Sequence, residues 1–380
     1  MPKHKPRSGS LAFYPKKRAK RQLATFTTFA PLAQAKETTK ALNFVGYKAG
    51  MVSCIGRNER PKSTTAGHEI IVPATVVECP PLKVFGVRVY EKNGAGIQSI
   101  GEVTIEKTDK DLKRKIVSFR EKHSKKKKHK EHAGFDWVEQ VKGRAADLRL
   151  LVYAQPSMAG FGRKNPDVFE VFLSGNVEQK AAFAKEKLGK EISVSEVFSE
   201  KDFADVRAVD KGKGFAGVIE RAGVKHFKPK AKKHRIVGSI GPWNPSTVMW
   251  TVARPGQLGY QSRTELNKRV LLIGNDPKKI NPIGGFKNYG TVKSDYVLIA
   301  GSVPGIKKRS VSLRAGIRKS INDSFNVSGL TIISATAQGK IKEAETVAAE
   351  VKAEKVVSHK EEKKQHKSVE DELKEAGGKK

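Results

Sequence analysis

The segment from Arg221 to Thr264 contains nine Lys or Arg and no Asp or Glu in 44 residues. Four prolines and five glycines are spread through it, so a long helix cannot run along it, because proline breaks a helix and glycine weakens one. A segment this basic also has too little apolar surface to fold by itself. We therefore predict an extended loop over residues 222–264, called here the finger, which becomes ordered on a polyanion such as RNA.

Trp243 lies in the middle of the finger between Pro242 and Pro245, in the sequence GPWNP. A position in a hydrophobic core is the alternative for any tryptophan. A tryptophan flanked by two prolines, however, has no strand or helix to hold it in a core. We favour stacking on a base, or insertion into folded RNA, as the role of Trp243.

The positive charge belongs to the body of the chain. The formal net charge is +35, whereas the tail, residues 340–380, holds 11 basic and 10 acidic residues and is expected to be peripheral. Residues 1–21 hold eight Lys or Arg and no acid, and Phe13 and Tyr14 lie among them. This favours an extended basic arm on nucleic acid over a solvated tail. Residues 113–130, with ten basic residues and one acid, fit a flexible loop, a localisation signal or an RNA contact.

Several classes of protein are excluded. No stretch approaches 18 consecutive apolar residues, so we expect no transmembrane helix. Cys54 and Cys79 are the only cysteines, which excludes a disulfide framework or a four-cysteine zinc site and favours a reducing, cytoplasmic compartment. Residues 16–35 have the outline of a signal peptide, but three threonines and Pro31 interrupt the apolar part, so we do not expect secretion.

Runs rich in Val and Ile, separated by Gly and Pro, predict a mostly β protein. The predicted strands cover residues 44–55, 68–78, 83–91, 148–156, 205–210, 269–274 and 295–305. Residues 177–190 repeat Ala and Leu at helical spacing, after Asn176 and up to Gly189, and predict a helix. Because strands lie on both sides of this region, we expect a barrel interrupted by an α/β insertion.

No catalytic or metal site can be assembled from the sequence. Gly212 to Gly217 match the dinucleotide pattern G-x-G-x-x-G, but Gly223 and Pro229 follow too soon for the crossover helix that such a site requires. A tight glycine turn is the alternative, in which Lys211 and Lys213 can also approach a phosphate chain. The histidines in 123–132 lie among lysines, which repel a divalent ion. We expect no enzyme activity, no cofactor and no metal.

Residues 198–221, FSEKDFADVRAVDKGKGFAGVIER, resemble the signature of the L-three family of large-subunit ribosomal proteins, archaeal and eukaryotic branch. The family normally has Ser or Thr at the position of Asp210. Further matching segments are spread over residues 1–335: GSLAFYPKKRAKR, FVGYKAGM, ECPPLKVFGVRVY, PWNPSTVMWTVARPGQLGYQSRTELNK and GSVPGIKKRSVSLR.

The resemblance implies a small six-stranded β-barrel of the translation-protein type, an inserted α/β domain, a basic N-terminal arm and a long finger loop. The corresponding expected boundaries are residues 1–40 for the arm, 41–94 and 201–335 for the barrel core, 95–200 for the inserted domain and 340–380 for the charged tail. In the family, the loop reaches towards the peptidyl-transferase centre with a tryptophan near its tip. That position falls on Trp243, so Pro242, Trp243 and Asn244 are the expected tip.

The expected function is that of a structural constituent of the large ribosomal subunit, which binds rRNA near its 3′ end and supports early assembly. The expected partners are large-subunit rRNA and neighbouring ribosomal proteins, without a membrane, a small-molecule substrate or a second copy of the chain. The candidate rRNA-binding residues are Arg7, Lys16, Lys17, Arg18, Lys211, Lys213, Lys228, Lys230, Lys232, Lys233, His234, Arg235, Trp243, Arg254, Arg263 and Lys268. An RNA-modifying enzyme and an architectural protein for duplex DNA are the two alternatives, and neither accounts for the ordered set of motifs.

Overall fold

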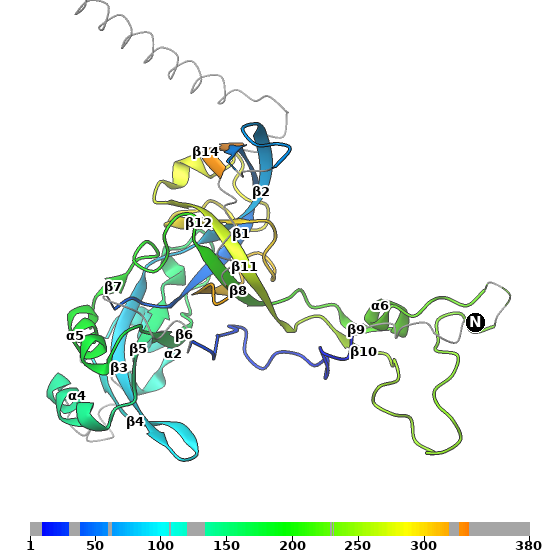
Figure 1. Cartoon of the computed structure of the whole chain (residues 1–380), viewed down its shortest axis with the longest axis horizontal. Helices are drawn as coiled ribbons and strands as arrows, with labels where there is room; N and C mark the ends of the chain where they lie inside the picture. The colour runs from blue at the N-terminus through cyan, green and yellow to red at the C-terminus, as the bar shows by residue number, and fades with distance from the viewer. Residues whose placement is uncertain are drawn as a thin grey trace, which may run out of the picture.

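The computed structural model describes residues 10–29, 39–59, 63–105, 108–119, 134–228, 230, 232–318 and 327–333. Arg7, much of the basic cluster at 113–130 and the whole tail at 340–380 lie outside these ranges. The described chain is mostly β, as predicted, with two larger antiparallel sheets and a separate two-stranded ribbon (Figure 1).

The first sheet closes on itself. Its strands are β1 (Asn43–Asn58), β2 (Glu69–Glu78), β8 (Phe203–Val209), β11 (Ser262–Gly274), β12 (Tyr296–Ala300), β13 (Ser310–Ala315) and β14 (Val327–Ile333). They are ordered β13-β8-β11-β12-β2-β1-β14, and β1 also pairs with β13. Six strands therefore form a closed ring of pairings, in which Tyr47 of β1 lies opposite both Ser310 of β13 and Glu78 of β2.

The second sheet is built mainly from the chain between the two halves of the ring. It contains β3 (Leu82–Asn93), β4 (Gly96–Thr104), β5 (Asp147–Ala154), β6 (Val168–Phe172) and the short β7 (Glu191–Ile192). Around these strands lie α2 (Lys110–Lys115), α4 (Phe135–Val141), α5 (Val177–Lys187) and the 3₁₀ turns η1 (Val117–Phe119), η2 (Lys142–Arg144) and η3 (Pro156–Met158).

The predicted helix is confirmed as α5. Its first turn is closed by a capping box in which the Asn176 side chain and the Gln179 side chain each accept a backbone N–H of the other residue. Ala181 and Ala184 face the core, and Gly189 follows the helix with a φ of +79°. The small residues on one face and the glycine at the end are therefore what position this helix on the sheet.

The position of β3 differs from the expected division of the chain, which assigns residues 41–94 to the barrel core. β3 pairs with β4, β5 and β7 in the second sheet. The physical reason lies in Pro80 and Pro81, which follow β2: neither has an N–H to donate to a neighbouring strand, so the chain leaves the first sheet there. The second sheet thus begins near Leu82.

Both sheets contribute to one continuous core. Buried side chains such as Cys54 and Val76 of the ring join Val87 and Leu150 of the second sheet in the same cluster. Cys54 and Cys79 are buried free thiols, and burial raises the pKa of Cys54 to about 11. The two thiols therefore act as small apolar side chains.

The finger leaves the ring between β8 and β11. At its base, β9 (Gly214–Ala216) pairs with β10 (Gly256–Leu258), and the five-residue helix α6 (Val218–Ala222) follows β9. Between β11 and β12 lies a further loop that contains the 3₁₀ turn η4 (Pro277–Lys279). Figure 1 shows the finger extending far from both sheets.

Candidate nucleic-acid interface

The base of the finger is a two-stranded ribbon held by one arginine. Arg221, at the end of α6, donates from Nε to the carbonyl of Gln257 (3.1 Å) and from Nη1 to the carbonyl of Arg254 (2.8 Å). Gly259 has a φ of +70°, and a Cβ there would lie 2.1 Å from the carbonyl oxygen of Lys211, so only glycine fits at this crossing. The pairing of β9 with β10 and the bonds of Arg221 thus hold the outgoing and returning chains of the finger together where they leave the ring.

The glycine motif at 212–217 forms this ribbon and not a dinucleotide site. Gly214 to Ala216 make β9, and α6 ends after five residues at Gly223, whose φ is +67°. A dinucleotide fold needs a long crossover helix at this point. The absence of a crossover helix agrees with the sequence prediction, but the predicted tight glycine turn is not found, because residues 214–216 form a strand that pairs with β10.

Trp243 is not a core residue. Its side chain is 91% exposed, and the described residues between α6 and β10 contain no helix or strand. Several other large apolar side chains of the finger are also exposed: Ile236, Ile240, Val248, Met249 and Trp250. Exposure of this many apolar groups on one extended segment is typical of a surface that binds a partner.

Most of the candidate rRNA-binding residues of the finger have solvent-exposed side chains. The exposed ones are Lys228, Lys230, Lys232, Lys233, Arg235 and Arg254, with His234 half-buried. Lys211 and Lys213 are exposed at the ribbon, where Lys213 forms a solvent-exposed ion pair with Glu220 (2.8 Å). Such a pair contributes little to stability, so Lys213 can exchange Glu220 for a phosphate at small cost.

Two further candidates form ion pairs within the protein. Arg263 pairs with Asp210 (3.2 Å) and Lys268 with Glu265 (2.6 Å). The other carboxylate oxygen of Asp210 accepts the backbone N–H of Gln261 (2.8 Å). Asp210, the departure from the family signature, therefore fixes the start of β11 and neutralises one candidate contact.

The N-terminal arm lies along the finger base, as the dark blue trace in Figure 1 shows. The ammonium of Lys16 donates to the carbonyl of Arg221 (2.8 Å), and the N–H of Ala19 donates to the carbonyl of Tyr260 (2.8 Å). The ring of Tyr14 meets Trp250 edge to face at 5.8 Å. Arm and finger base thus form one composite surface, on which Lys17 and Arg18 are exposed.

A buried arginine anchors the following part of the arm to the ring. Arg314 of β13 pairs with the fully buried Asp205 of β8 (2.5 Å) and donates to the carbonyl of Thr28 (2.6 Å). Its guanidinium also lies 4.2 Å from the ring centroid of Phe26. Arg207 of β8 also donates to the carbonyl of Thr25 (2.9 Å). Two arginines of the strand ring, of which Arg314 is the buried one, therefore hold residues 24–29.

Phe215 is a candidate contact that the sequence reasoning did not select. It lies on β9 and is 80% exposed beside Lys213. The available signal was its place in KGKGFAG, residues 211–217, where two lysines and three glycines leave the aromatic side chain without large apolar neighbours in the sequence. The strand pairing shows why Phe215 is exposed: β9 belongs to a two-stranded ribbon, which has no core that could bury the Phe215 side chain.

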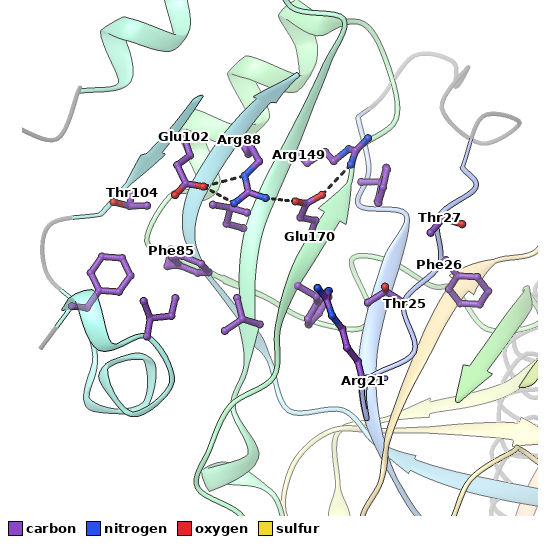
Figure 2. Close-up of a pocket in the computed structure, with 16 residues that line it drawn as sticks. Arg21, Thr25, Phe26, Thr27, Phe85, Arg88, Glu102, Thr104, Arg149 and Glu170 are labelled. Atoms are coloured by element: carbon purple, nitrogen blue, oxygen red, sulfur yellow. Dashed lines mark hydrogen bonds and ion pairs between the residues drawn. The ribbon is translucent and has the colours of Figure 1, made fainter. Parts of the chain in front are cut away.

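A cavity of about 510 Å³ lies between the arm and the second sheet. Figure 2 shows Glu102, Arg88, Glu170 and Arg149 as a row of paired charges along its wall. Arg88 binds both Glu102 and Glu170 (2.6 Å each), and Arg149 binds Glu170 (3.0 Å). Each carboxylate is engaged by an arginine, so this wall stabilises the sheet and offers no base for catalysis.

Burial by itself would raise the pKa of Glu170. Hydrogen bonds from Tyr90 and Arg149 and the charges of Arg149 and Arg88 outweigh burial and hold this pKa below its ordinary value of 4.5. A lowered folded-state pKa means that the ionised network stabilises the fold above about pH 4.5. This contribution is lost as the pH falls through the folded-state pKa.

We therefore expect Glu170→Gln to lower the free energy of unfolding by about 1.5 to 3 kcal/mol at neutral pH, because charged hydrogen bonds are lost. The difference from the unsubstituted chain should shrink as the pH falls below the pKa of Glu170, measured by urea unfolding at a series of pH values. Glu139→Gln is the matched control, since the Glu139–Lys185 pair is exposed. A Glu170→Gln effect that did not vary with pH would contradict the assignment.

Within the described ranges, no group of three or more His, Cys, Asp and Glu side chains could hold a metal ion. In the same ranges, no helix has the length and apolar character needed to cross a membrane.

Comparison with known proteins gives one consistent result. The family model for ribosomal protein L3 matches residues 1–358, somewhat further than the motifs quoted above extend. A protein of Archaeoglobus fulgidus named large ribosomal subunit protein uL3 is 43% identical over 332 residues, which cover 85% of this chain and 96% of the relative. Relatives of the same name from Methanocaldococcus jannaschii and Methanothermobacter thermautotrophicus are 40% and 41% identical, covering 89% and 83% of this chain and 98% and 92% of their own.

Proposed function

The chain belongs to the ribosomal protein L3 family, and on this basis we propose that it is a structural constituent of the large ribosomal subunit. In this proposal it binds large-subunit rRNA near the 3′ end of that RNA and supports early assembly of the subunit. The finger organises the surroundings of the peptidyl-transferase centre, with Pro242, Trp243 and Asn244 at its tip. The protein works in the cytoplasm, within the ribosome, as a binding protein and not as an enzyme.

The observation that carries the proposal is the finger itself. It combines seven exposed cations with a 91% exposed tryptophan and has no acidic residue over its 43 positions. In water such a segment gains nothing from its exposed apolar side chains and repels itself through its charges. RNA offers phosphates to the cations and base faces to the aromatic side chains. Binding to RNA therefore both reduces the charge repulsion and covers the exposed apolar side chains.

The remaining parts have distinct roles in this proposal. The closed ring of six strands is the small barrel that docks on rRNA, and the second sheet with its helices is the inserted α/β domain, which contacts neighbouring ribosomal proteins. The arm at 1–40 and the finger at 222–264 enter the RNA together, since Lys16 and Tyr14 already join them at the base. The charged tail at 340–380 is peripheral.

Selective binding tests this function. The full chain should bind large-subunit rRNA at least about tenfold more tightly than small-subunit rRNA or duplex DNA at one fixed salt concentration. Filter binding at several salt concentrations measures this. Equal affinity for all three nucleic acids would reject the proposal, because charge alone would then account for binding.

Replacement of the exposed tryptophan separates binding from folding. Trp243→Ala should weaken binding to large-subunit rRNA roughly 5- to 150-fold, since stacking of a base on an aromatic ring contributes about 1 to 3 kcal/mol. The thermal midpoint should not change, because the side chain is exposed. Trp243→Phe should keep most of the affinity, and Ile97→Ala, an exposed apolar side chain on β4, is the matched control. A large fall in the midpoint would show that Trp243 packs within the fold.

A further inference from the structure

The loop between β11 and β12 presents a second isolated apolar side chain. Ile283 is 91% exposed, as much as Trp243. It lies in a tight turn in which the N–H of Gly285 donates to the carbonyl of Pro282 (2.8 Å), with a φ of +69° at Gly285. The proline before it and the two glycines after it leave Ile283 no neighbour within the turn to pack against.

This loop is rigidly fixed. Both groups of the Asn281 amide bond to the backbone of Val292 (2.8 and 2.9 Å), which closes the loop at its neck. The buried carboxylate of Glu78 accepts the backbone N–H groups of Lys293 (2.6 Å) and Ser294 (3.0 Å). Phe286 is buried against the backbone of Gly50. Ile283 therefore cannot fold back onto the protein without breaking these contacts.

Basic side chains lie on the same loop and on the loop that precedes β13. Residues 277–294 and 301–309 contain no Asp or Glu. The ammonium of Lys307 donates to the carbonyl of Lys287 (2.7 Å), so the two loops lie side by side. The half-buried or exposed lysines of the pair are Lys278, Lys279, Lys287, Lys293, Lys307 and Lys308. None of their ammonium groups forms an ion pair with a carboxylate of the described chain.

We propose that these two loops, residues 277–294 and 301–309, form a second rRNA-binding surface, called here the Ile283 surface. Its lysines neutralise phosphates, and Ile283 packs against an exposed base or sugar of structured RNA. This inference rests on the proposed rRNA-binding function but concerns residues outside the arm and the finger.

Charge and rigidity are what favour RNA as the occupant. An ordinary protein surface mixes both signs of charge, whereas the two loops carry six lysines and no acid within them. Asp276 and Asp295 border the first loop, so the cations remain in clear excess, and a phosphate backbone matches such an excess. Apolar side chains such as isoleucine are also used as wedges against base steps in nucleic-acid complexes. Because the turn is already fixed, binding does not have to order it.

Two variants of the full chain test the two parts of the surface. Ile283→Ala should weaken binding to large-subunit rRNA about tenfold, with an unchanged dependence on salt, because it removes only apolar contact. Lys278→Gln with Lys279→Gln should instead reduce the slope of log affinity against log salt by about 1.5. Ile97→Ala is again the apolar control, and Lys92→Gln with Lys110→Gln, two exposed lysines near the second sheet, is the charge control.

Cross-linking identifies the occupant directly. A photoreactive amino acid in place of Ile283 should cross-link to rRNA in the assembled large subunit. Cross-links to protein alone would overturn the inference. If Trp243→Ala weakens rRNA binding while the Ile283 and Lys278/Lys279 variants bind like the unsubstituted chain, the Ile283 surface is rejected and the proposed function stands. If the unsubstituted chain shows no preference for large-subunit rRNA, both are rejected.

Discussion

Asp205→Ala is expected to lower the free energy of unfolding by about 3 to 5 kcal/mol, because it leaves the cation of Arg314 buried without its partner. Asp205 is fully buried, and its second oxygen accepts the backbone N–H of Asn267 (3.0 Å), so the substitution also leaves a donor on β11 unpaired. The substitution therefore removes a hydrogen bond that links two neighbouring strands of the ring, β8 and β11. Urea unfolding of the full chain at neutral pH measures the loss.

The same substitution should loosen the arm. Arg314 holds the carbonyl of Thr28 and lies over the ring of Phe26, and a displaced guanidinium weakens both contacts. Proteolysis in the basic stretch 16–21 should therefore become faster than in the unsubstituted chain. Glu220→Ala, which breaks the exposed pair with Lys213, is the matched control and should cost less than about 0.5 kcal/mol.

A double substitution distinguishes the cost of an unpaired charge from the value of the pair. Asp205→Leu combined with Arg314→Met should recover much of the stability lost in Asp205→Ala, since apolar replacement of both partners is often tolerated. It should not restore the arm, because the bond to Thr28 needs the guanidinium. A loss below about 1 kcal/mol in Asp205→Ala would show that the pair is dispensable.

Removal of four finger charges is expected to have the largest effect on RNA binding. With Lys228, Lys230, Lys232 and Lys233 all replaced by Gln, affinity for large-subunit rRNA should fall about 10³-fold at ~0.1 M salt, and the salt slope should fall by about 3 to 4. All four side chains are exposed, so the thermal midpoint should be preserved. Filter binding over a range of salt concentrations gives both quantities.

The control for this variant removes the same charge elsewhere. Lys92, Lys110, Lys164 and Lys190 are exposed outside the finger, and their joint replacement by Gln changes the net charge equally. We expect the control to lose far less affinity, because those lysines do not lie on the proposed surface. Equal losses in the two variants would mean that only the total charge attracts RNA and that the finger has no special role.

The strands were largely predictable because each is encoded by its own residues. Val- and Ile-rich runs such as 44–55 and 269–274 fall within β1 and β11, and the helix predicted at 177–190 is α5. The pairing of the strands was less predictable. β3 follows β2 in the chain yet belongs to the other sheet, and the sequence marks this only by two prolines whose effect depends on where the chain goes next.

The interface divides in the same way. The absence of acid over 44 residues and the prolines around Trp243 were sufficient to predict an extended basic finger, because charge and backbone restriction act locally. Only the folded structure decides that Trp243, Phe215 and Ile283 are exposed, that Lys16 and Tyr14 join the arm to the finger, and that Asp210 occupies Arg263. These features arise from contacts between distant residues, such as Arg314 and Thr28, 286 positions apart. Composition and local pattern thus determined that the finger is extended and basic, because charge and backbone restriction act within the segment. Long-range packing decided which of its side chains are exposed and which are engaged by other parts of the protein.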